Sequence, residues 1–335
     1  MGYDKGSTLI LSDADIRGLL TMPDAIDWMR EAFTSLSDGS AQAPVRQFVE
    51  MPAAESGLLL MPSWRSSDTV AAVKLISLHD RNPERGRPRS LASVLVLDGS
   101  SGDLLGLLDG EHLTAVRTGA ASGLATDLLA REDSTVLVLF GGGRQAETQL
   151  EAVCAVRSIE TVLVYTRSAA SAVAFAERVG GRTSAGIIPS PPRSRIAEGD
   201  IVCTATTSTV PVFDDDELGP GVHINGAGSY RPDMSEVPAH TVARSIVVVD
   251  QREACMAEAG DLIQAVGQGF AWADVRADLG ELVADPHRGR RMPSETTFFK
   301  SVGNAVQDLV TAVRLLELAA TREVGLRVSL RGRLD

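Results

Sequence analysis

The spacing of apolar and polar residues divides the chain into segments of different type. Residues 9–11 form a short apolar run, and residues 13–36 have the spacing of amphipathic helices, with Ser12 placed as an N-cap. Between residues 46 and 97 the apolar residues come instead in short runs separated by Gly, Pro, Asp and Asn, which predicts an antiparallel or mixed sheet. Residues 112–130 return to helical spacing. The N-terminal part is therefore expected to combine helices with a sheet.

After Asp133 short apolar runs alternate with helical segments. The predicted strands are residues 135–140, 161–165, 201–205, 223–227 and 246–249. This alternation is typical of βαβ units and predicts a parallel, doubly wound sheet. The last apolar helix, near residues 303–320, has no predicted strand after it, so it need not belong to this sheet. The second domain is expected to begin near the end of the 112–130 helix.

Length and charge narrow the classes of function. A chain of 335 residues is long enough for two ordinary domains. Its net charge of −12 argues against a surface that binds nucleic acid or anionic lipid. No apolar run approaches the roughly 20 residues that span a bilayer, and the N-terminus lacks a signal-peptide pattern. Three widely spaced cysteines predict neither a disulfide framework nor a metal site. We expect a cytoplasmic protein that acts on small molecules.

A glycine-rich loop follows the first strand of the alternating part. The apolar segment 134–140 leads directly into Gly141-Gly142-Gly143-Arg144-Gln145-Ala146, and a helical segment follows. Gly141 permits a tight turn, Gly143 lets the backbone approach a pyrophosphate, and Ala146 allows close helix packing. The helix N-terminus supplies amide donors to an anion. The alternative is a glycine-rich turn without a ligand, but the strand before and the helix after favour dinucleotide binding.

The end of the second strand bears on the choice of dinucleotide. Here the chain reads Thr166-Arg167-Ser168, without the carboxylate that would accept hydrogen bonds from an unphosphorylated ribose. Hydroxyls and a guanidinium suit a 2′-phosphate instead, which favours NADP over NAD. The alternative is that Arg167 only faces solvent, as most surface arginines do. The cofactor site is also expected to include Thr204 and Ala205, at the end of the predicted strand 201–205, together with Ser301 and Gly303.

Two cations lie in apolar surroundings and need an explanation. Lys74 interrupts the apolar run 70–76, where an unpaired ammonium is costly to bury. Arg117 has Leu113, Thr114, Ala120 and Ala121 as its helical neighbours, so it faces a small, mostly apolar surface. Both could hold an anionic ligand, or each could extend to solvent or join a structural ion pair with one of the 44 acidic residues. The residues alone leave these alternatives open.

A series of motifs in order resembles the ornithine cyclodeaminase/mu-crystallin family. The matching segments are Arg46, Met61-Pro62, Ala72-Val73-Lys74, Asn82-Pro83, residues 114–120, residues 141–146, Ala259-Gly260-Asp261 and residues 299–303. The resemblance covers nearly the whole chain. It implies that Arg46, Lys74 and Arg117 hold the carboxylate of an α-imino or α-amino acid beside the nicotinamide, with Lys74 as the proton donor.

The resemblance also implies a domain arrangement. Residues 1–120 together with 305–335 would form a discontinuous α+β domain that binds substrate and forms a homodimer through its sheet. Residues 121–304 would form the inserted Rossmann domain, so that the fold class is α/β with a second α+β domain.

Two positions depart from the family pattern. Tyr230 stands where the cyclodeaminase branch carries an aspartate, which argues against ornithine cyclization. Arg89 stands where the family more often has a threonine near the substrate, and it is a candidate for binding a second acidic group. The alternative for Arg89 is a solvated loop charge.

The function expected from these features is NADPH-dependent reduction of a small α-imino acid to an amino acid, or the reverse dehydrogenation. Two alternatives remain open. One is an ornithine or lysine cyclodeaminase, and the other is a mu-crystallin-like protein that binds NADPH and a small ligand.

Overall fold

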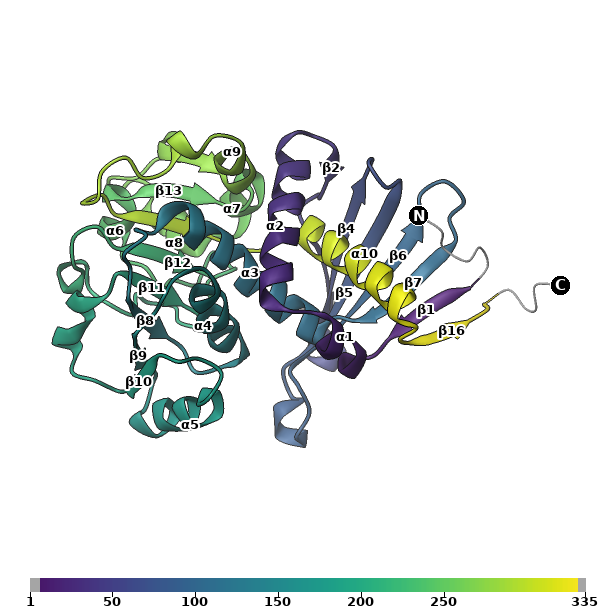
Figure 1. Ribbon diagram of the computed structural model, residues 1–335, viewed down its shortest axis with the longest axis horizontal. Coiled ribbons are helices and arrows are strands. Elements are labelled where there is room, and N and C mark those ends of the chain that lie inside the picture. Colours follow the sequence, from purple (N-terminus) through teal and green to yellow (C-terminus); the bar gives the residue numbers. More distant parts are fainter. Residues whose placement is uncertain (1–6, 331–335) are drawn as a thin grey trace. The chain divides into compact units, whose positions relative to one another are not determined.

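The computed structural model describes residues 7–330, which divide into two compact units (Figure 1). Unit 1 contains the described residues up to Arg117 and those from Asn304 onward, and unit 2 contains Thr118–Gly303. Helix α3, Glu111–Leu129, begins in unit 1 and ends in unit 2. No helix among residues 7–330 has the length and apolar character needed to cross a membrane.

Unit 1 is built on a sheet with strand order β16-β1-β7-β6-β5-β4-β2, and β3 pairs with β4. The strands are β1 Thr8–Leu11, β2 Ala41–Gln42, β3 Gln47–Met51, β4 Ser56–Arg65, β5 Val70–His79, β6 Ser90–Asp98, β7 Leu104–Asp109 and β16 Leu326–Val328. The pairs from β3 to β7 are antiparallel and β1 pairs with β7 in parallel, so the predicted mixed sheet is confirmed.

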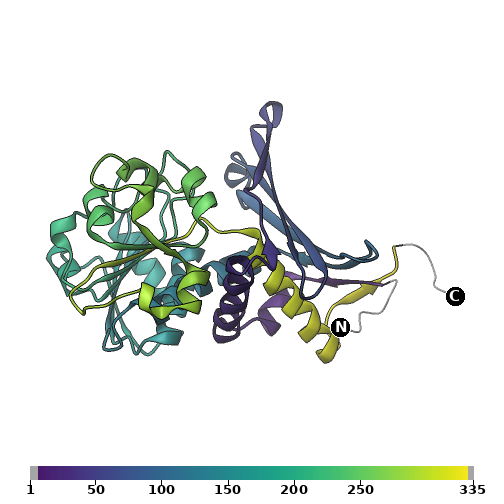
Figure 2. The same ribbon diagram turned by 90° about the horizontal axis from the view of Figure 1, so that it is seen from above.

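Helices of unit 1 cover one face of this sheet (Figure 2). They are α1 Asp13–Leu19, α2 Met22–Ser37 and α10 Ala305–Arg322. Ser12 caps α1 through a capping box with Asp15, as its position predicted. The side chain of Asn304 caps α10 by accepting from Val306 N at 3.2 Å and Gln307 N at 3.4 Å. Most of α10 is buried, so it forms the core of unit 1.

The prediction that no strand follows the last helix is wrong. Strand β16, Leu326–Val328, pairs antiparallel with β1 at the edge of the sheet in unit 1. With only three residues, largely exposed, it shows no alternation from which a strand could be identified.

Unit 2 contains a parallel sheet with strand order β10-β9-β8-β11-β12-β15-β13-β14. The strands are β8 Val136–Phe140, β9 Thr161–Tyr165, β10 Gly186–Pro189, β11 Ile201–Thr204, β12 His223–Gly226, β13 Ile246–Val249, β14 Val275–Asp278 and β15 Thr297–Lys300. The predicted parallel, doubly wound sheet is therefore confirmed. Strands β10, β14 and β15 were not predicted, although β15 lies between β12 and β13 and is entirely buried.

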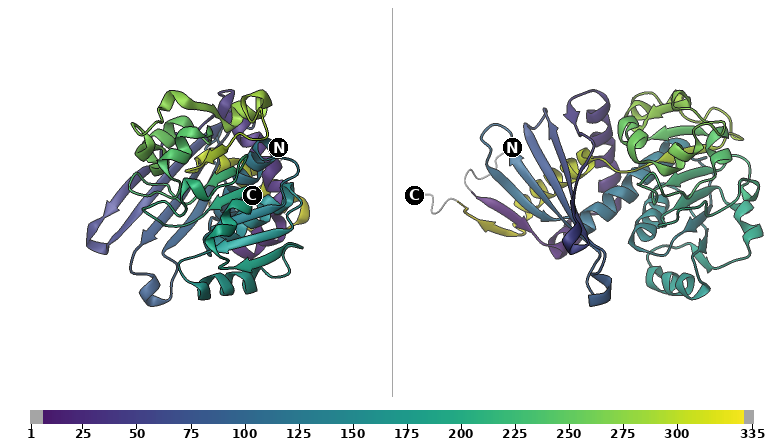
Figure 3. Two further views of the ribbon diagram at one scale, coloured as in Figure 1. Left: turned by 90° about the vertical axis from the view of Figure 1, so that its left-hand side faces the viewer. Right: turned by 180° about the vertical axis from the view of Figure 1, so that it is seen from behind.

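Helices pack on both faces of the sheet in unit 2. They are α4 Arg144–Val156, α5 Ala169–Val179, α6 Ala239–Arg244, α7 Arg252–Glu258, α8 Gly260–Ala265 and α9 Leu279–Ala284. Leu137 and Leu139 of β8 pack in a core that includes residues of α4 and α5, whereas Val138 packs in a second core with residues of α6 to α8. Successive side chains of β8 therefore point to opposite faces of the sheet, and the ribbon shows helices on both faces (Figure 3).

Short 3-10 helices complete the chain. They are Pro52–Ala54, Pro83–Arg85, Arg193–Glu198, Asp215–Glu217, Trp272–Asp274 and Pro286–Arg288.

Candidate active site

Lys74 lies in the middle of β5 with its side chain fully buried. Its neighbours across the sheet are Met61 of β4 and Val94 of β6, both apolar. The Nζ atom forms an ion pair with Oδ2 of Asp308, which belongs to α10, at 2.6 Å. A charge that the local sequence makes costly to bury is therefore compensated by a residue far along the chain.

Arg117 uses the same carboxylate. Its Nε donates to Asp308 Oδ1 at 3.0 Å, and its Nη1 donates to Gln307 Oε1 at 2.6 Å. Asp308 is only 1% exposed and binds one cation with each of its two oxygens. Of the alternatives left open by the sequence, the structural ion pair is present for both Lys74 and Arg117. Their arrangement around one carboxylate also brings the two predicted carboxylate-binding cations together.

Burial and neighbouring charges alter the protonation of Lys74. Burial, followed by the positive charge of Arg117, lowers the pKa of Lys74 from 10.5 to about 7, and Asp308 opposes this shift. Arg46, in the connection between β2 and β3, also lowers the pKa, so its charge reaches Lys74. A lysine that titrates near neutral pH is suited to give or take a proton.

Lysine is rare in this chain, which makes the position of Lys74 informative. Only Lys5, Lys74 and Lys300 are lysines, and the other 29 of the 32 basic residues are arginines. Lys5 lies outside the described residues, and both Lys74 and Lys300 are fully buried in ion pairs. A buried lysine changes its protonation readily, whereas arginine keeps its charge. Both buried positions therefore hold the basic residue that can lose its proton.

Arg89 lies apart from this cluster. It pairs with Asp80 at 2.6 Å, and both side chains are more than half exposed. Its carbonyl accepts a bond from the backbone of His79, five residues beyond Lys74 along β5, which corresponds to about 17 Å of strand. Arg89 therefore lies at the surface, which agrees with the alternative that it is a solvated loop charge.

Asp308 and Gln307 were not identified from the sequence. A signal was present, because two polar residues interrupt the apolar positions of α10, and both are fully buried. Their partner Arg117 lies 190 residues away along the chain, so local periodicity could not pair them.

The glycine loop has the geometry that a dinucleotide requires. Gly141 has φ +129°, and a Cβ there would lie 2.6 Å from the carbonyl oxygen of Ala205, so only glycine fits. A Cβ at Gly143 would meet no atom within 4 Å, which leaves space for a phosphate. Helix α4 begins at Arg144 with Gly143 as N-cap and no side-chain cap, and such a helix start can bind an anion. Ala146 is fully buried, as its predicted packing role requires.

The segment at the end of β9 offers a guanidinium but few free hydroxyl donors. Thr166 Oγ1 donates to the carbonyl of Ser168 at 2.7 Å, and Ser168 caps α5 by accepting from Ser171 N at 3.2 Å. Arg167 is exposed, and none of the ion pairs found among residues 7–330 involves it.

The other four predicted cofactor residues already have structural partners. Thr204 Oγ1 donates to Glu236 at 3.0 Å, and the amide of Ala205 donates to the carbonyl of Phe140 at 2.8 Å. Ser301 Oγ and Gly303 N both donate to Asp250 Oδ2, at 2.8 Å and 2.6 Å. These partners fix the strand ends at which the residues lie.

A buried carboxylate holds the loops that follow β11 and β12. Glu236 accepts from Thr204 Oγ1 at 3.0 Å, from both N and Oγ1 of Thr206, at 2.6 and 2.7 Å, and from the amides of Gly228 and Ser229, at 2.8 and 3.0 Å. Burial, with the charge of nearby Asp261, raises the pKa of Glu236. No role for Glu236 was predicted from the sequence.

Lys300 and Asp261 complete this network. Lys300 Nζ lies 2.9 Å from both Asp261 Oδ2 and Ser229 Oγ. Although burial opposes it, the charge of Lys300 holds the pKa of Asp261 below its ordinary value. The network fixes Ser229, next to Tyr230, and the Tyr230 side chain is 38% exposed.

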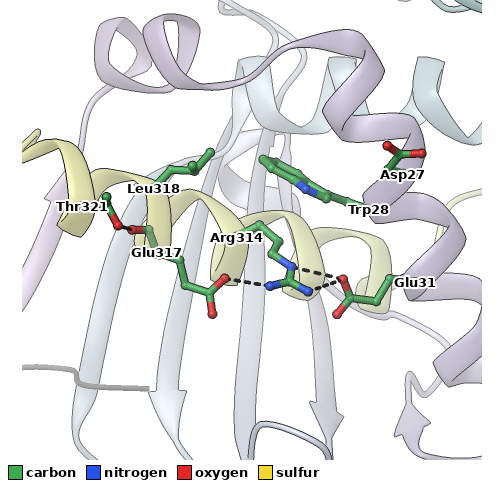
Figure 4. Close-up of a pocket in the computed structure, with 7 residues that line it drawn as sticks. All are labelled: Asp27, Trp28, Glu31, Arg314, Glu317, Leu318 and Thr321. Carbon is green, nitrogen blue, oxygen red and sulfur yellow. Dashed lines mark hydrogen bonds and ion pairs between the residues drawn. The ribbon is translucent and has the colours of Figure 1, made fainter.

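A surface pocket of about 430 Å³ lies between α2 and α10 of unit 1 (Figure 4). Arg314 in its wall pairs with Glu31 at 2.7 Å and with Glu317 at 2.9 Å. Among the described residues, none of the predicted site residues lines this pocket. Its central cation has two carboxylate partners, whereas Lys74 and Arg117 share the single carboxylate of Asp308.

Comparison with known proteins finds the same family that the sequence motifs resemble. The model of the ornithine cyclodeaminase/mu-crystallin family matches residues 7–322. A Δ1-pyrroline-2-carboxylate reductase from Bacillus cereus is 35% identical over 323 residues, which cover 96% of this chain and 99% of the relative.

Two solved structures are similar to this chain over nearly its whole length. The Thermococcus litoralis Δ1-pyrroline-2-carboxylate reductase, in complex with NADH and L-proline, matches with a TM-score of 0.90 and 38% identity over 96% of this chain and 100% of the other. An archaeal alanine dehydrogenase dimer with bound NAD matches with a TM-score of 0.89 and 31% identity, covering 97% of this chain and 99% of the other.

Proposed function

The chain belongs to the ornithine cyclodeaminase/mu-crystallin family, and we propose that it reduces a small cyclic α-imino acid to the amino acid with a nicotinamide dinucleotide. The observation that carries the proposal is the buried group of Lys74, Arg117 and Asp308. The similar reductases from Bacillus cereus and Thermococcus litoralis support a substrate of the Δ1-pyrroline-2-carboxylate type. The reverse reaction, oxidation of the amino acid, uses the same groups.

Arg117 and Arg46 bind the substrate carboxylate. Nε of Arg117 donates to Asp308, and Nη1 donates to Gln307. Nη2 therefore remains to bind an oxygen of the substrate carboxylate. Because α10 already holds the guanidinium in place, little side-chain entropy is lost when the substrate binds.

Lys74 supplies the proton of the reaction. The bound dinucleotide supplies a hydride to the carbon of the C=N bond. The nitrogen takes one proton, so reduction consumes one proton for each imine. With its pKa lowered to about 7 by burial and by Arg117, Lys74 holds a proton that it can release near neutral pH.

We propose NADPH as the preferred cofactor. Arg167 is exposed at the end of β9, and no acidic residue stands at positions 166–168 to bind the ribose hydroxyls of NADH. The two solved relatives described above contain NADH or NAD, so the preference must be measured on this chain.

Cyclodeamination is the less favoured alternative. Tyr230 has no carboxylate to accept a proton, and its neighbour Ser229 is held by Asp261 and Lys300. A protein that only binds NADPH and a ligand is the other alternative, and it requires no titrating lysine.

We propose that two copies of the chain form a homodimer through the sheet face of unit 1 that α2 and α10 leave uncovered. Val73, Leu75 and Leu95 alternate with the buried residues of β5 and β6 and remain partly exposed. Trp64 is 39% exposed, and Leu91 is 48% exposed. A partly exposed apolar sheet face is typical of an interface, and the similar alanine dehydrogenase is a dimer. Light scattering that gives the mass of one chain would contradict the dimer.

An activity screen tests the function. NADPH or NADH oxidation is followed with cyclic ketimines and with 2-oxo acids plus amines. Ammonia release is measured separately. Oxidation that depends on a cyclic imino acid supports the proposal. Ammonia release without net cofactor change supports a cyclodeaminase, and tight cofactor binding without turnover supports a binding protein.

A further inference from the structure

We propose that Asp308 is a positioning residue that keeps Lys74 in its proton-donating form and so sets the upper pH limit of imine reduction. The inference rests on the proposed function, because it concerns the proton that the reduction consumes. It assigns a role to a residue that the sequence analysis did not identify.

Asp308 lies between Lys74 and Arg117 and contacts both. Asp308 lies near the start of α10, is 1% exposed, and contacts Lys74 Nζ at 2.6 Å and Arg117 Nε at 3.0 Å with different oxygens. The helix start is itself fixed by Asn304 and is tethered to β4 by Ser63, whose Oγ donates to the carbonyl of Ala305 at 3.1 Å. The carboxylate therefore has a fixed position relative to both cations.

The charges that face Lys74 shift its pKa in opposite directions. Across the sheet, β4 and β6 present the apolar Met61 and Val94. Arg117 of α3 and Arg46 disfavour the ammonium form, and so does burial. Among the charged groups of the described residues that act on Lys74, Asp308 favours the ammonium. Without this carboxylate, burial and two cations would together drive the proton off Lys74.

Imine reduction requires Lys74 in its protonated form. The carbon of the C=N bond receives a hydride, and the nitrogen receives a proton, so the protein must enter each turnover with Lys74 protonated. The substrate carboxylate adds a second negative charge only after it has bound. In the free protein, Asp308 provides that charge, and the pH dependence of kcat/KM reports on the free protein.

The experiment compares pH profiles of kcat/KM for the wild type, Asp308→Asn and Asp308→Glu with one cyclic imino acid. In the wild type, kcat/KM should fall as pH rises through about 7, where Lys74 loses its proton. In Asp308→Asn the fall should move to lower pH by about one to three pH units, the usual effect of removing an opposite charge at this range. Asp308→Glu keeps the charge and should stay closer to the wild type. The substrate's own ionisation is the same in all three proteins and cancels in the comparison.

Ser63→Ala is the matched structural control. It removes a buried contact between α10 and β4 and changes no charge. It should lower the stability without moving the pH profile. A profile that shifts as much in Ser63→Ala as in Asp308→Asn would overturn the proposal, as would an unshifted profile in folded Asp308→Asn.

A second readout does not depend on activity. With only three lysines in the chain, protein labelled with ¹³C at lysine Cε gives three lysine signals, and Lys74→Met identifies the one from Lys74. This signal should titrate near pH 7 in the wild type and at lower pH in Asp308→Asn. If Asp308→Asn does not fold, a smaller downward shift in Asp308→Glu is the expected result. An unchanged midpoint in the folded variants would overturn the proposal. A shifted midpoint in a protein that reduces no imine would refute the proposed function alone.

Discussion

Replacing Lys74 by methionine separates the contribution of the ammonium to catalysis from its contribution to the fold. Methionine has a similar length and suits the apolar neighbours of β5, so the packing should survive. Asp308 keeps Arg117 at 3.0 Å, so its carboxylate is not left buried without a cation. Because an ion is replaced by an apolar group while the remaining charges stay paired, the stability near neutral pH should change little.

The catalytic effect should be much larger. Loss of a positioned proton donor lowers kcat by about 10²- to 10⁴-fold, which corresponds to about 3 to 5 kcal/mol of transition-state stabilisation. KM should rise less, because Arg117 and Arg46 still bind the carboxylate. Lys74→Arg is the charge-preserving control, and it should also be slow because a guanidinium does not release its proton near neutral pH.

The pH dependence of stability gives an independent measure of the same group. The folded-state pKa of Lys74 is about 7, below its ordinary 10.5, so the unfolded state binds more protons between these values. The stability of the wild type relative to Lys74→Met should therefore rise as pH increases from about 7 to about 10.5. The difference of about 3.5 pH units corresponds to at most about 5 kcal/mol. Urea unfolding at several pH values measures it, and parallel stability curves for the two proteins, or full reductase activity in Lys74→Met, would refute the reasoning.

Three further substitutions test the other assignments. Arg117→Lys keeps the charge but loses the planar fork, so KM for the imino acid should rise with little change in NADPH affinity, and unchanged kinetics would contradict the assignment. Arg167→Ala should weaken NADPH by about 1.5 to 3 kcal/mol and NADH far less. If fluorescence titrations show that the affinities for NADPH and NADH fall equally, Arg167 does not contact the 2′-phosphate. Arg89→Thr should reduce any preference for dicarboxylic over monocarboxylic imines, and equal selectivity in both proteins would leave Arg89 as the partner of Asp80 only.

The features predicted from the sequence are those with a local signal. The strand, glycine loop and helix around Gly141 occupy adjacent residues, so their order alone predicted the cofactor loop. Lys74 and Arg117 were identified because a charge in an apolar segment needs a partner. Asp308, the partner, lies more than 190 residues from either cation, so local spacing could not find it. Strand β15 was also not recognised, because its four residues, Thr-Phe-Phe-Lys, are too few to show a periodicity, and the strands β12 and β13 that flank it come from other parts of the chain.

The most direct test of the central claim is one reaction balance with purified protein. NADPH oxidation is measured with Δ1-pyrroline-2-carboxylate, and proline and ammonia formation are measured with ornithine. The account predicts that NADPH is consumed in equal amount to the proline formed from the imine, with negligible ammonia from ornithine. Robust conversion of ornithine to proline and ammonia without net NADPH consumption would contradict it.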